Sequence, residues 1–437
     1  MNKILLTIII TFGFVQAEEW IYFNNMTDYE WGVGMDFSVS RISPDGEISE
    51  TILDDVQYSD ISEDGTKLLY IEYAQIEDVN WDMVEPVSFS IYNTETSETI
   101  SSITGINPVY ARFTHDENIV LYMEGYATNW QLYKYSFADS SSTMLSDSLS
   151  AAFNNMTMSP DGQQVLYFKL AEDENADNSY MDYEVIVSHI ETGESTTLAI
   201  IPYYINGFGN NSIWSDNGFI YLNFLDDNNC VQLIGIHSSL GYITQLTDNP
   251  CTGEIGYYCV PSILNTKETD LDKFIYSVCS DLGMGTYNWI YDIESGESSF
   301  LDSLYSEIGV VSFSIDQSWS PDGTKVSFSE ILYNGWVSVP PKIRVYDTVT
   351  ESTHTLGNGT VIDDPESYYV GSPINWIEDG LAGDVNGDDS VDVLDVVMLV
   401  SYILSGDTSE LDGADINNDG DINVLDIVAL VSIILGN

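Results

Sequence analysis

The stretch WSPDGTKVSFSE, residues 319–330, joins a tight turn to an alternating strand. Its Pro-Asp-Gly sequence favours a turn, and the run KVSFSE alternates polar and apolar residues as a half-buried strand does. Related turn markers recur along the chain at intervals of roughly 45 to 57 residues, which indicates an internal repeat. The seven markers are ISEDG (61–65), FTHDEN (113–118), MSPDG (158–162), WSDNG (214–218), NTKETD (265–270), WSPDG (319–323) and WIEDG (376–380).

Each repeat predicts four antiparallel strands. An apolar run such as QQVLYFKL (163–170) follows the marker, and two strands around a polar turn come later, as in YEVIVSHIETGESTTL (183–198). No helical periodicity interrupts the body of the chain. Seven such repeats predict an all-β, seven-bladed β-propeller. The SPDG turns resemble those of the TolB-type propeller family, and this resemblance implies the same fold.

The two ends of the repeat region complement each other. The last marker follows a single strand in SPINWIEDG (372–380), whereas the N-terminal segments EEWIYFNN (18–25) and DFSVSRISPDGEISETIL (36–53) supply three strands. We therefore expect the seventh sheet to be built from both ends of a propeller spanning residues 18–380. Such closure removes the open edges that an unclosed sheet would expose.

The C-terminal region contains a second, shorter repeat. The sequence GDVNGDDSVDVLDVVMLVSYIL (383–404) is followed by the similar ADINNDGDINVLDIVALVSIIL (414–435). In each copy, oxygen-bearing residues stand at positions 1, 3, 5, 9 and 12 of a loop, and position 7 offers its carbonyl, which is the spacing of an EF-hand calcium loop. The predicted ligands are Asp384, Asn386, Asp388, Ser390, Asp392 and Asp395 for one Ca²⁺ ion, and Asp415, Asn417, Asp419, Asp421, Asn423 and Asp426 for a second.

These paired loops, each followed by one helix, resemble a type I dockerin. The resemblance implies a small all-α domain at residues 381–437, two calcium ions and a cohesin-like partner. Asp389 replaces the usual glycine at position 6, so we expect the first site to be weaker. Positions 10 and 11 are the apolar pairs Val393–Leu394 and Val424–Leu425, which either contact an apolar partner or pack the two helices together.

The N-terminus and the charge balance predict export. Residues 1–17 read as a signal peptide, with Lys3, an apolar run and a small-residue cleavage site at Ala17. No later apolar stretch is long enough for a membrane span. With 11 basic and 70 acidic residues, the net charge of −59 excludes nucleic acid as a partner. We expect a secreted, extracellular or cell-surface protein, with the periplasm as the alternative.

The four cysteines lie within one stretch of the propeller, which in an exported protein suggests disulfides. Three pairings are possible. The proposed order of the blades favours Cys251–Cys259 and Cys230–Cys279, because each pair then lies at adjacent blades.

Long loops between the second and third strands of each blade are rich in aromatic residues. Aromatic rings beside carboxylates and amides suit the apolar faces and hydroxyl groups of sugars. The alternative is that these rings pack over the blade ends. The candidate residues for an extracellular glycan or protein ligand are Trp31, Trp81, Trp130, Trp336, Tyr126, Tyr180, Tyr183 and Tyr287.

Catalytic signatures are sparse. The chain has no GxSxG or HExxH motif, and its four histidines are scattered over different repeats, so no catalytic residue can be named. The sequence favours a secreted recognition module that its dockerin anchors to a cohesin-bearing surface or complex. The alternative is a polysaccharide hydrolase or lyase of a dockerin-mediated extracellular complex. A third hypothesis gives the calcium repeats a role in secretion or attachment without any cohesin.

Overall fold

The computed structural model defines most of the repeat region and parts of the C-terminal region. It describes residues 19–30, 34–62, 64–77, 82–94, 96–126, 129–149, 156–171, 181–203, 212–225, 231–248, 273–279, 285–305, 311–333, 338–356, 367–378, 385, 391, 393–405, 414, 416 and 422–434. None of the helices within these ranges is long and apolar enough to cross a membrane.

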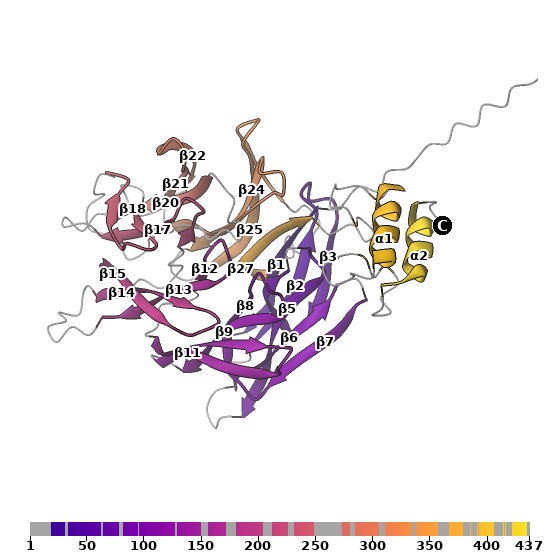
Figure 1. Ribbon diagram of the computed structural model, residues 1–437. Coiled ribbons are helices and arrows are strands. Elements are labelled where there is room, and N and C mark those ends of the chain that lie inside the picture. Colours follow the sequence, from indigo (N-terminus) through magenta and orange to yellow (C-terminus); the bar gives the residue numbers. More distant parts are fainter. Residues whose placement is uncertain are drawn as a thin grey trace, which may run out of the picture. The chain divides into compact units, whose positions relative to one another are not determined.

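The described strands form seven antiparallel sheets, which are the blades of a propeller (Figure 1). Blades 1 to 3 are β4 (Val56–Ile61), β5 (Lys67–Glu77), β6 (Asp82–Asn93) and β7 (Glu98–Thr104); β8 (Pro108–Phe113), β9 (Ile119–Tyr126), β10 (Asn129–Ser136) and β11 (Ser141–Leu149); and β12 (Thr157–Met158), β13 (Gln164–Leu170), β14 (Met181–His189) and β15 (Ser195–Tyr203). Blades 4 to 6 are β16 (Ile213–Trp214), β17 (Phe219–Leu225), β18 (Val231–His237) and β19 (Ile243–Gln245); β20 (Lys273–Cys279), β21 (Gly285–Asp292) and β22 (Glu297–Tyr305); and β23 (Val311–Trp319), β24 (Lys325–Tyr333), β25 (Ser338–Asp347) and β26 (Ser352–Thr355).

Blade 7 joins the two ends of the repeat region, as the sequence predicts. Its strand order is β27 (Ser367–Glu378), β1 (Glu19–Glu30), β2 (Gly34–Ile42) and β3 (Ser49–Asp54). Strands from the beginning and the end of the propeller therefore lie side by side in one sheet. Blade 5 shows three strands in the described part of the chain, and the predicted marker at 265–270 lies outside the described residues.

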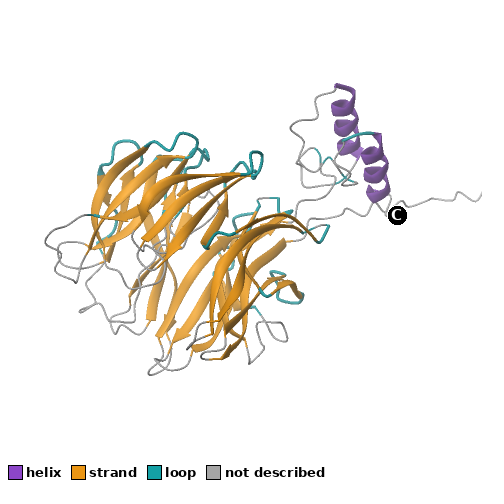
Figure 2. Cartoon of the chain, turned by 90° about the horizontal axis from the view of Figure 1, so that it is seen from below, coloured by secondary structure: helices purple, strands orange, loops and turns teal. Residues whose placement is uncertain are grey.

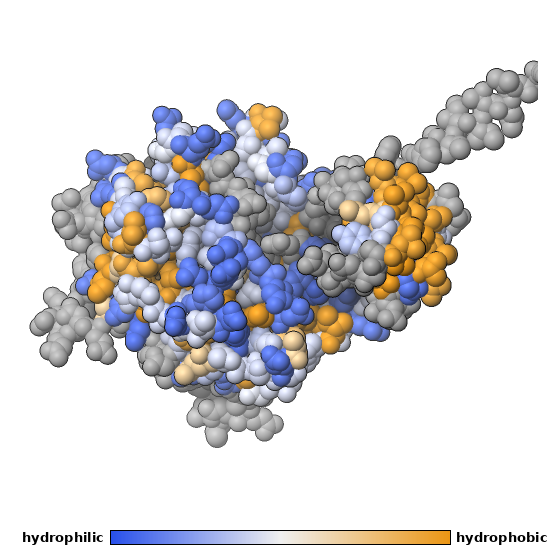
Figure 3. All heavy atoms as spheres, in the orientation of Figure 1, coloured by the Kyte–Doolittle hydropathy of each residue, from blue (hydrophilic) through white to orange (hydrophobic). Residues whose placement is uncertain are grey.

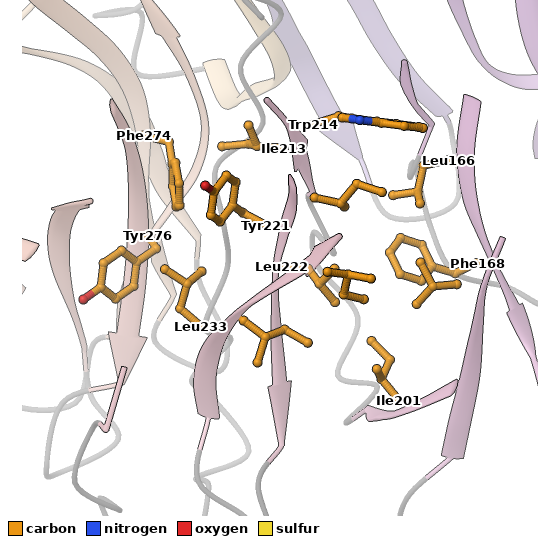
Figure 4. Packing of buried hydrophobic residues seen from close by; sticks show 14 of the residues in the cluster. Leu166, Phe168, Ile201, Ile213, Trp214, Tyr221, Leu222, Leu233, Phe274 and Tyr276 are labelled. Carbon is orange, nitrogen blue, oxygen red and sulfur yellow. The ribbon is translucent and has the colours of Figure 1, made fainter. Parts of the chain in front are cut away.

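Apolar clusters between neighbouring blades hold the ring together. Figure 4 shows the largest cluster, in which Trp214 and Tyr221 of blade 4 lie between Leu166 of blade 3 and Phe274 of blade 5. Five other clusters join blades 1 and 2, 2 and 3, 5 and 6, 6 and 7, and 7 and 1. Every contact between consecutive blades thus buries apolar side chains, which is the main favourable contribution to folding.

Polar side chains on the innermost strands add hydrogen bonds from one blade to the next. In blade 1, the Ser59 hydroxyl donates to the Ala111 carbonyl of blade 2 at 2.6 Å, and Asp60 accepts the amide of Phe113 at 2.9 Å. The same device recurs at Thr157, whose hydroxyl donates to the Ser212 carbonyl beside blade 4 at 3.0 Å. These groups are buried, so each bond removes the cost of an unsatisfied polar atom.

The SPDG markers are turns that their own side chains stabilise. Ser159 donates to Asp161 at 2.6 Å and accepts the amide of Gln164 at 2.9 Å, and Gly162 has a positive φ of 64°. The serine–aspartate bond lowers the pKa of Asp161 below its usual value, since hydrogen bonding favours the charged form. The SPDG turn at 320–323 repeats this geometry, and both turns join the first and second strands of a blade.

The C-terminal segment falls into a separate unit from the propeller. The larger unit comprises Trp20–Glu63 and Lys67–Ile377, and Glu378–Asn437 belongs to the smaller one. The described helices of the chain are α1 (Val393–Ser405) and α2 (Val424–Ile434), both in this segment (Figure 2). Their core consists of the buried residues Val385, Val391, Leu399, Ala414 and Leu430.

Candidate functional site

The start of α2 shows how the second predicted calcium loop ends. The amide of Asn423 donates to the Asp426 carboxylate at 2.7 Å, and the Asn423 side-chain oxygen accepts the amide of Leu425 at 2.9 Å. This reciprocal arrangement is a capping box, which satisfies amides that the first helical turn leaves unpaired. Both residues are predicted from sequence as calcium ligands, and their capping role was not predicted, although Asn followed by Asp three positions later was a visible signal.

Asp395 and Asp426 each occupy position 12 of a predicted calcium loop. Both are fully buried, and each lies in the first turn of its helix, where the helix dipole favours a negative charge. Residues 383–437 contain twelve acidic residues and no Lys, Arg or His. Burying a carboxylate is costly unless it is paired or coordinates a metal. Asp426 accepts the amide of Asn423, and the side chains of this region supply no positive charge to either carboxylate.

These described residues fit a calcium ion. Ca²⁺ prefers carboxylate, amide and carbonyl oxygens, which are the donors that Asp395, Asn423 and Asp426 carry. Within the described ranges, no group of three or more His, Cys, Asp or Glu side chains is close enough to hold a metal. The other predicted ligands lie outside the described residues: Asp384, Asn386, Asp388, Ser390, Asp392, Asp415, Asn417, Asp419 and Asp421.

The apolar pairs at positions 10 and 11 are exposed in both copies. The exposed fractions are 64% for Val393, 56% for Leu394, 62% for Val424 and 55% for Leu425. The alternative that these pairs pack the two helices together is therefore wrong, because other residues of α1 and α2 form the core. Figure 3 shows apolar atoms gathered on the surface over the two helices.

Val397 and Val428 extend this exposed surface, and the sequence reasoning missed them. They are 58% and 63% exposed. Each lies four residues after Val393 or Val424, a spacing that places two side chains on the same face of a helix. The helical spacing was the available signal. It did not single out this face, because apolar residues lie on nearly all sides of both helices.

The predicted aromatic ligand face needs correction, first at Tyr183. Tyr183 lies in β14, is 3% exposed and belongs to the core cluster of blades 3, 4 and 5. It pairs with Leu170 of β13, so it stands inside a strand and not in a loop. Burial raises the pKa of Tyr183 to about 12. Its assignment to a ligand-binding surface is wrong.

Trp130 also stands in a strand. It pairs with Gly125 across β9 and β10, and its half-buried ring packs against the cluster between blades 2 and 3. An alanine at this position would therefore remove packing as well as any ligand contact. The backbones of Tyr126 and Tyr287 lie in β9 and β21, whereas Trp31, Trp81, Trp336 and Tyr180 lie outside the described residues.

The proposed disulfides stay predictions. Cys230, Cys251 and Cys259 lie outside the described residues, and only the backbone of Cys279 is described, at the end of β20.

Comparison with known proteins identifies the C-terminal region. The family model of the dockerin type I domain matches residues 382–435. No curated protein matches the chain. Similar solved structures include TolB from Acinetobacter baumannii, with 12% identity over 81% of this chain and 82% of that chain and a TM-score of 0.43.

Two oligogalacturonate lyases are also similar. One, in complex with manganese, has 11% identity over 77% of this chain and 85% of that chain, with a TM-score of 0.47. The other, from Vibrio parahaemolyticus, has 11% identity over 78% and 86%, with a TM-score of 0.45. Identities this low do not carry an activity from one protein to another. The chain thus combines a seven-bladed β-propeller, with TolB-like structural neighbours, and a type I dockerin domain at residues 382–435.

Proposed function

We propose that this chain is an exported calcium-binding protein whose dockerin domain attaches it to a cohesin-bearing surface or complex. The propeller then acts as a recognition module for an extracellular glycan or protein. The observation that carries the proposal is the dockerin match at residues 382–435. Dockerin domains imply a cohesin partner and are typical of extracellular proteins.

Two calcium ions would hold the dockerin domain in its folded form. The first would be bound by Asp384, Asn386, Asp388, Ser390, Asp392 and Asp395, and the second by the equivalent residues from Asp415 to Asp426. Calcium supplies the positive charge that offsets the repulsion among twelve acidic residues. The burial of Asp395 and Asp426 supports this assignment.

The propeller's role in recognition rests on its surface chemistry. A net charge of −59 over the chain repels polyanions such as nucleic acids, whereas a neutral glycan or a protein with basic side chains meets no such barrier. Trp31, Trp81 and Trp336, which the sequence predicts in loops, would supply stacking surfaces for such a ligand.

The anchoring part is tested by capture of the full-length chain on purified cohesin domains, in calcium and in chelator. We expect capture in calcium, loss of capture in chelator, and loss in the variant Asp395→Asn/Asp426→Asn. The propeller's melting transition serves as the control for folding, and it should not move in the variant. Capture that is equally strong in chelator would contradict the proposal.

The recognition part is tested on a glycan array together with an assay for reducing-sugar release. Binding without release supports a recognition module, and Trp81→Ala should weaken it. Sustained release of reducing ends by the purified chain would instead establish the polysaccharide-degrading alternative. Trp130 is unsuitable as the test position because its ring also packs against the core.

A further inference from the structure

The dockerin domain carries an apolar surface that its own fold does not use. We call the exposed residues Val393, Leu394, Val397, Val424, Leu425 and Val428 the docking stripe. Each residue of α1 in this set has an equivalent in α2, and all six are between 55% and 64% exposed. The exposure is nearly equal within each pair: 64% and 62%, 56% and 55%, 58% and 63%.

Helix packing does not account for the docking stripe. The core between the helices is formed by Leu399 and Leu430, which are fully buried, together with Val385, Val391 and Ala414. Polar residues at the stripe positions would therefore leave the core intact. Large exposed apolar patches on soluble proteins mark sites of interaction, and here the same patch chemistry is present twice.

The docking stripe carries no charge, whereas every charged side chain in the surrounding domain is acidic. Residues 383–437 hold twelve acidic residues and no basic one, yet all six stripe residues are Val or Leu. A partner that docked through carboxylates would be repelled by the surrounding acids and would find no basic side chain to pair with. A partner that docked through Lys or Arg would bury those charges against valine and leucine, which is unfavourable.

We infer that the docking stripe binds a cohesin-like partner whose contact surface is apolar and uncharged. This inference rests on the proposed function and adds the chemistry of the partner to it. Burial of apolar area drives such an interface, so salt does not weaken it as it weakens a charged interface. Salt also screens the acidic surroundings, so affinity should stay level or rise between low and high ionic strength.

The experiment measures binding of the full-length, calcium-loaded chain to a panel of purified cohesin domains at low and high sodium chloride. The test variant is Val393→Ser/Leu394→Thr/Val424→Ser/Leu425→Thr. Val349→Ser is the matched control, since Val349 is an exposed apolar residue of the propeller at 75% exposure. Calcium-dependent circular dichroism verifies that the dockerin domain of each variant folds.

We expect at least about a hundredfold loss of affinity in the quadruple variant, because four apolar side chains would no longer be buried. The control should bind as the original chain does, and salt should not reduce binding. A cohesin that binds the quadruple variant equally well, or that binds less tightly in high salt, overturns the inference and leaves the proposed function standing. Absence of binding to any cohesin in calcium overturns both. Concentration-dependent dimerisation that the quadruple variant abolishes would assign the stripe to a second copy of this chain and also overturn the inference.

Discussion

The propeller and the dockerin domain differ in the surroundings of their buried carboxylates. Both are rich in acidic residues, and both bury carboxylates. In the propeller, Asp60 is buried beside the backbone amide of Phe113, which donates to it. In the dockerin domain, Asp395 and Asp426 are buried in a region that has no basic side chain. A backbone amide also donates to Asp426, so this kind of bond is common to both regions. The difference is that only the propeller has basic side chains, and in the dockerin domain the proposed calcium ions would supply the positive charge.

The apolar cores of the two regions differ in size and in aromatic content. Six clusters rich in Trp, Tyr and Phe or in large aliphatic residues join the blades of the propeller. The described residues of the dockerin domain form one small cluster, and none of the members of that cluster is aromatic. Because hydrophobic stabilisation scales with the apolar area buried, the propeller should be stable alone, and the smaller domain should need its metal.

The largest effect of a single substitution should come from the closing blade of the propeller. Trp376 is 2% exposed and packs with Ile343 and Val345 between blades 6 and 7. Trp376→Ala should lower the free energy of unfolding by about 3–5 kcal/mol through lost burial and a cavity. Chemical denaturation followed by tyrosine and tryptophan fluorescence measures it. Trp376→Phe, as the control, should cost less, and equal costs for both variants would contradict the packing described.

A smaller effect should come from the hydrogen bond that links blades 7 and 1. The Tyr58 hydroxyl donates to the buried Asn375 side-chain oxygen at 2.5 Å. Tyr58→Phe leaves that oxygen without this donor, so the propeller should lose about 1–3 kcal/mol of unfolding free energy. Tyr70→Phe is the matched control, because the Tyr70 hydroxyl bonds Thr99 at a more exposed site. Equal losses of unfolding free energy in Tyr58→Phe and Tyr70→Phe would contradict a larger contribution from the bond between blades.

In the dockerin domain, the capping box gives a further test. Asn423→Ala removes the oxygen that accepts the Leu425 amide, so the calcium-loaded domain should lose about 1 kcal/mol through the cap, in addition to the loss of Asn423 as a proposed calcium ligand. Asn423→Ser keeps a capping oxygen and should recover most of the loss through the cap. Thermal unfolding of the helices, followed by circular dichroism, measures both. A substitution that shifts the propeller's transition instead would show that the two regions do not unfold separately.

The smallest effect concerns acid stability. The serine hydroxyl of each SPDG turn lowers the pKa of its aspartate, as Ser43 does for Asp45 and Ser159 for Asp161. A pKa lowered in the folded state contributes stability above the unfolded value near 3.8, and this stability is lost as the pH falls through the folded pKa. Ser159→Ala should therefore reduce the loss of propeller stability between pH 7 and pH 3. Urea unfolding at both values measures it, and an unchanged pH dependence would contradict the role of this bond.

The propeller could be predicted from sequence because its repeats carry local signals. The SPDG and related turns mark where one strand ends and the next begins, and the incomplete repeats at the two ends predicted the shared blade. Tyr183 was wrongly assigned to a loop because the sequence does not mark the residue at which β14 begins. β14 begins at Met181, and Tyr183, Val185 and Val187 share one face of it, because all three belong to the cluster of blades 3, 4 and 5. This period of two was a usable signal.

The docking stripe could be predicted only in part. The run VLDVVMLVSYIL is apolar on nearly all sides of the helix, so periodicity does not tell which face is buried. Packing decides it, because Leu399 meets the core of the domain while Val393 and Leu394 face outward. The calcium loops, in contrast, are predicted from fixed positions in the sequence, and their ligands stay predictions. Asp395 and Asp426, at position 12 of the two loops, are buried.

The most direct test of this account is calorimetry of the full-length chain in calcium and in chelator. We expect two transitions in calcium, one for the dockerin domain and one for the propeller. Chelation should abolish the dockerin transition, together with the helical circular dichroism of α1 and α2, and leave the propeller transition in place. Identical scans with and without calcium, or a propeller transition that collapses on chelation, would contradict the account.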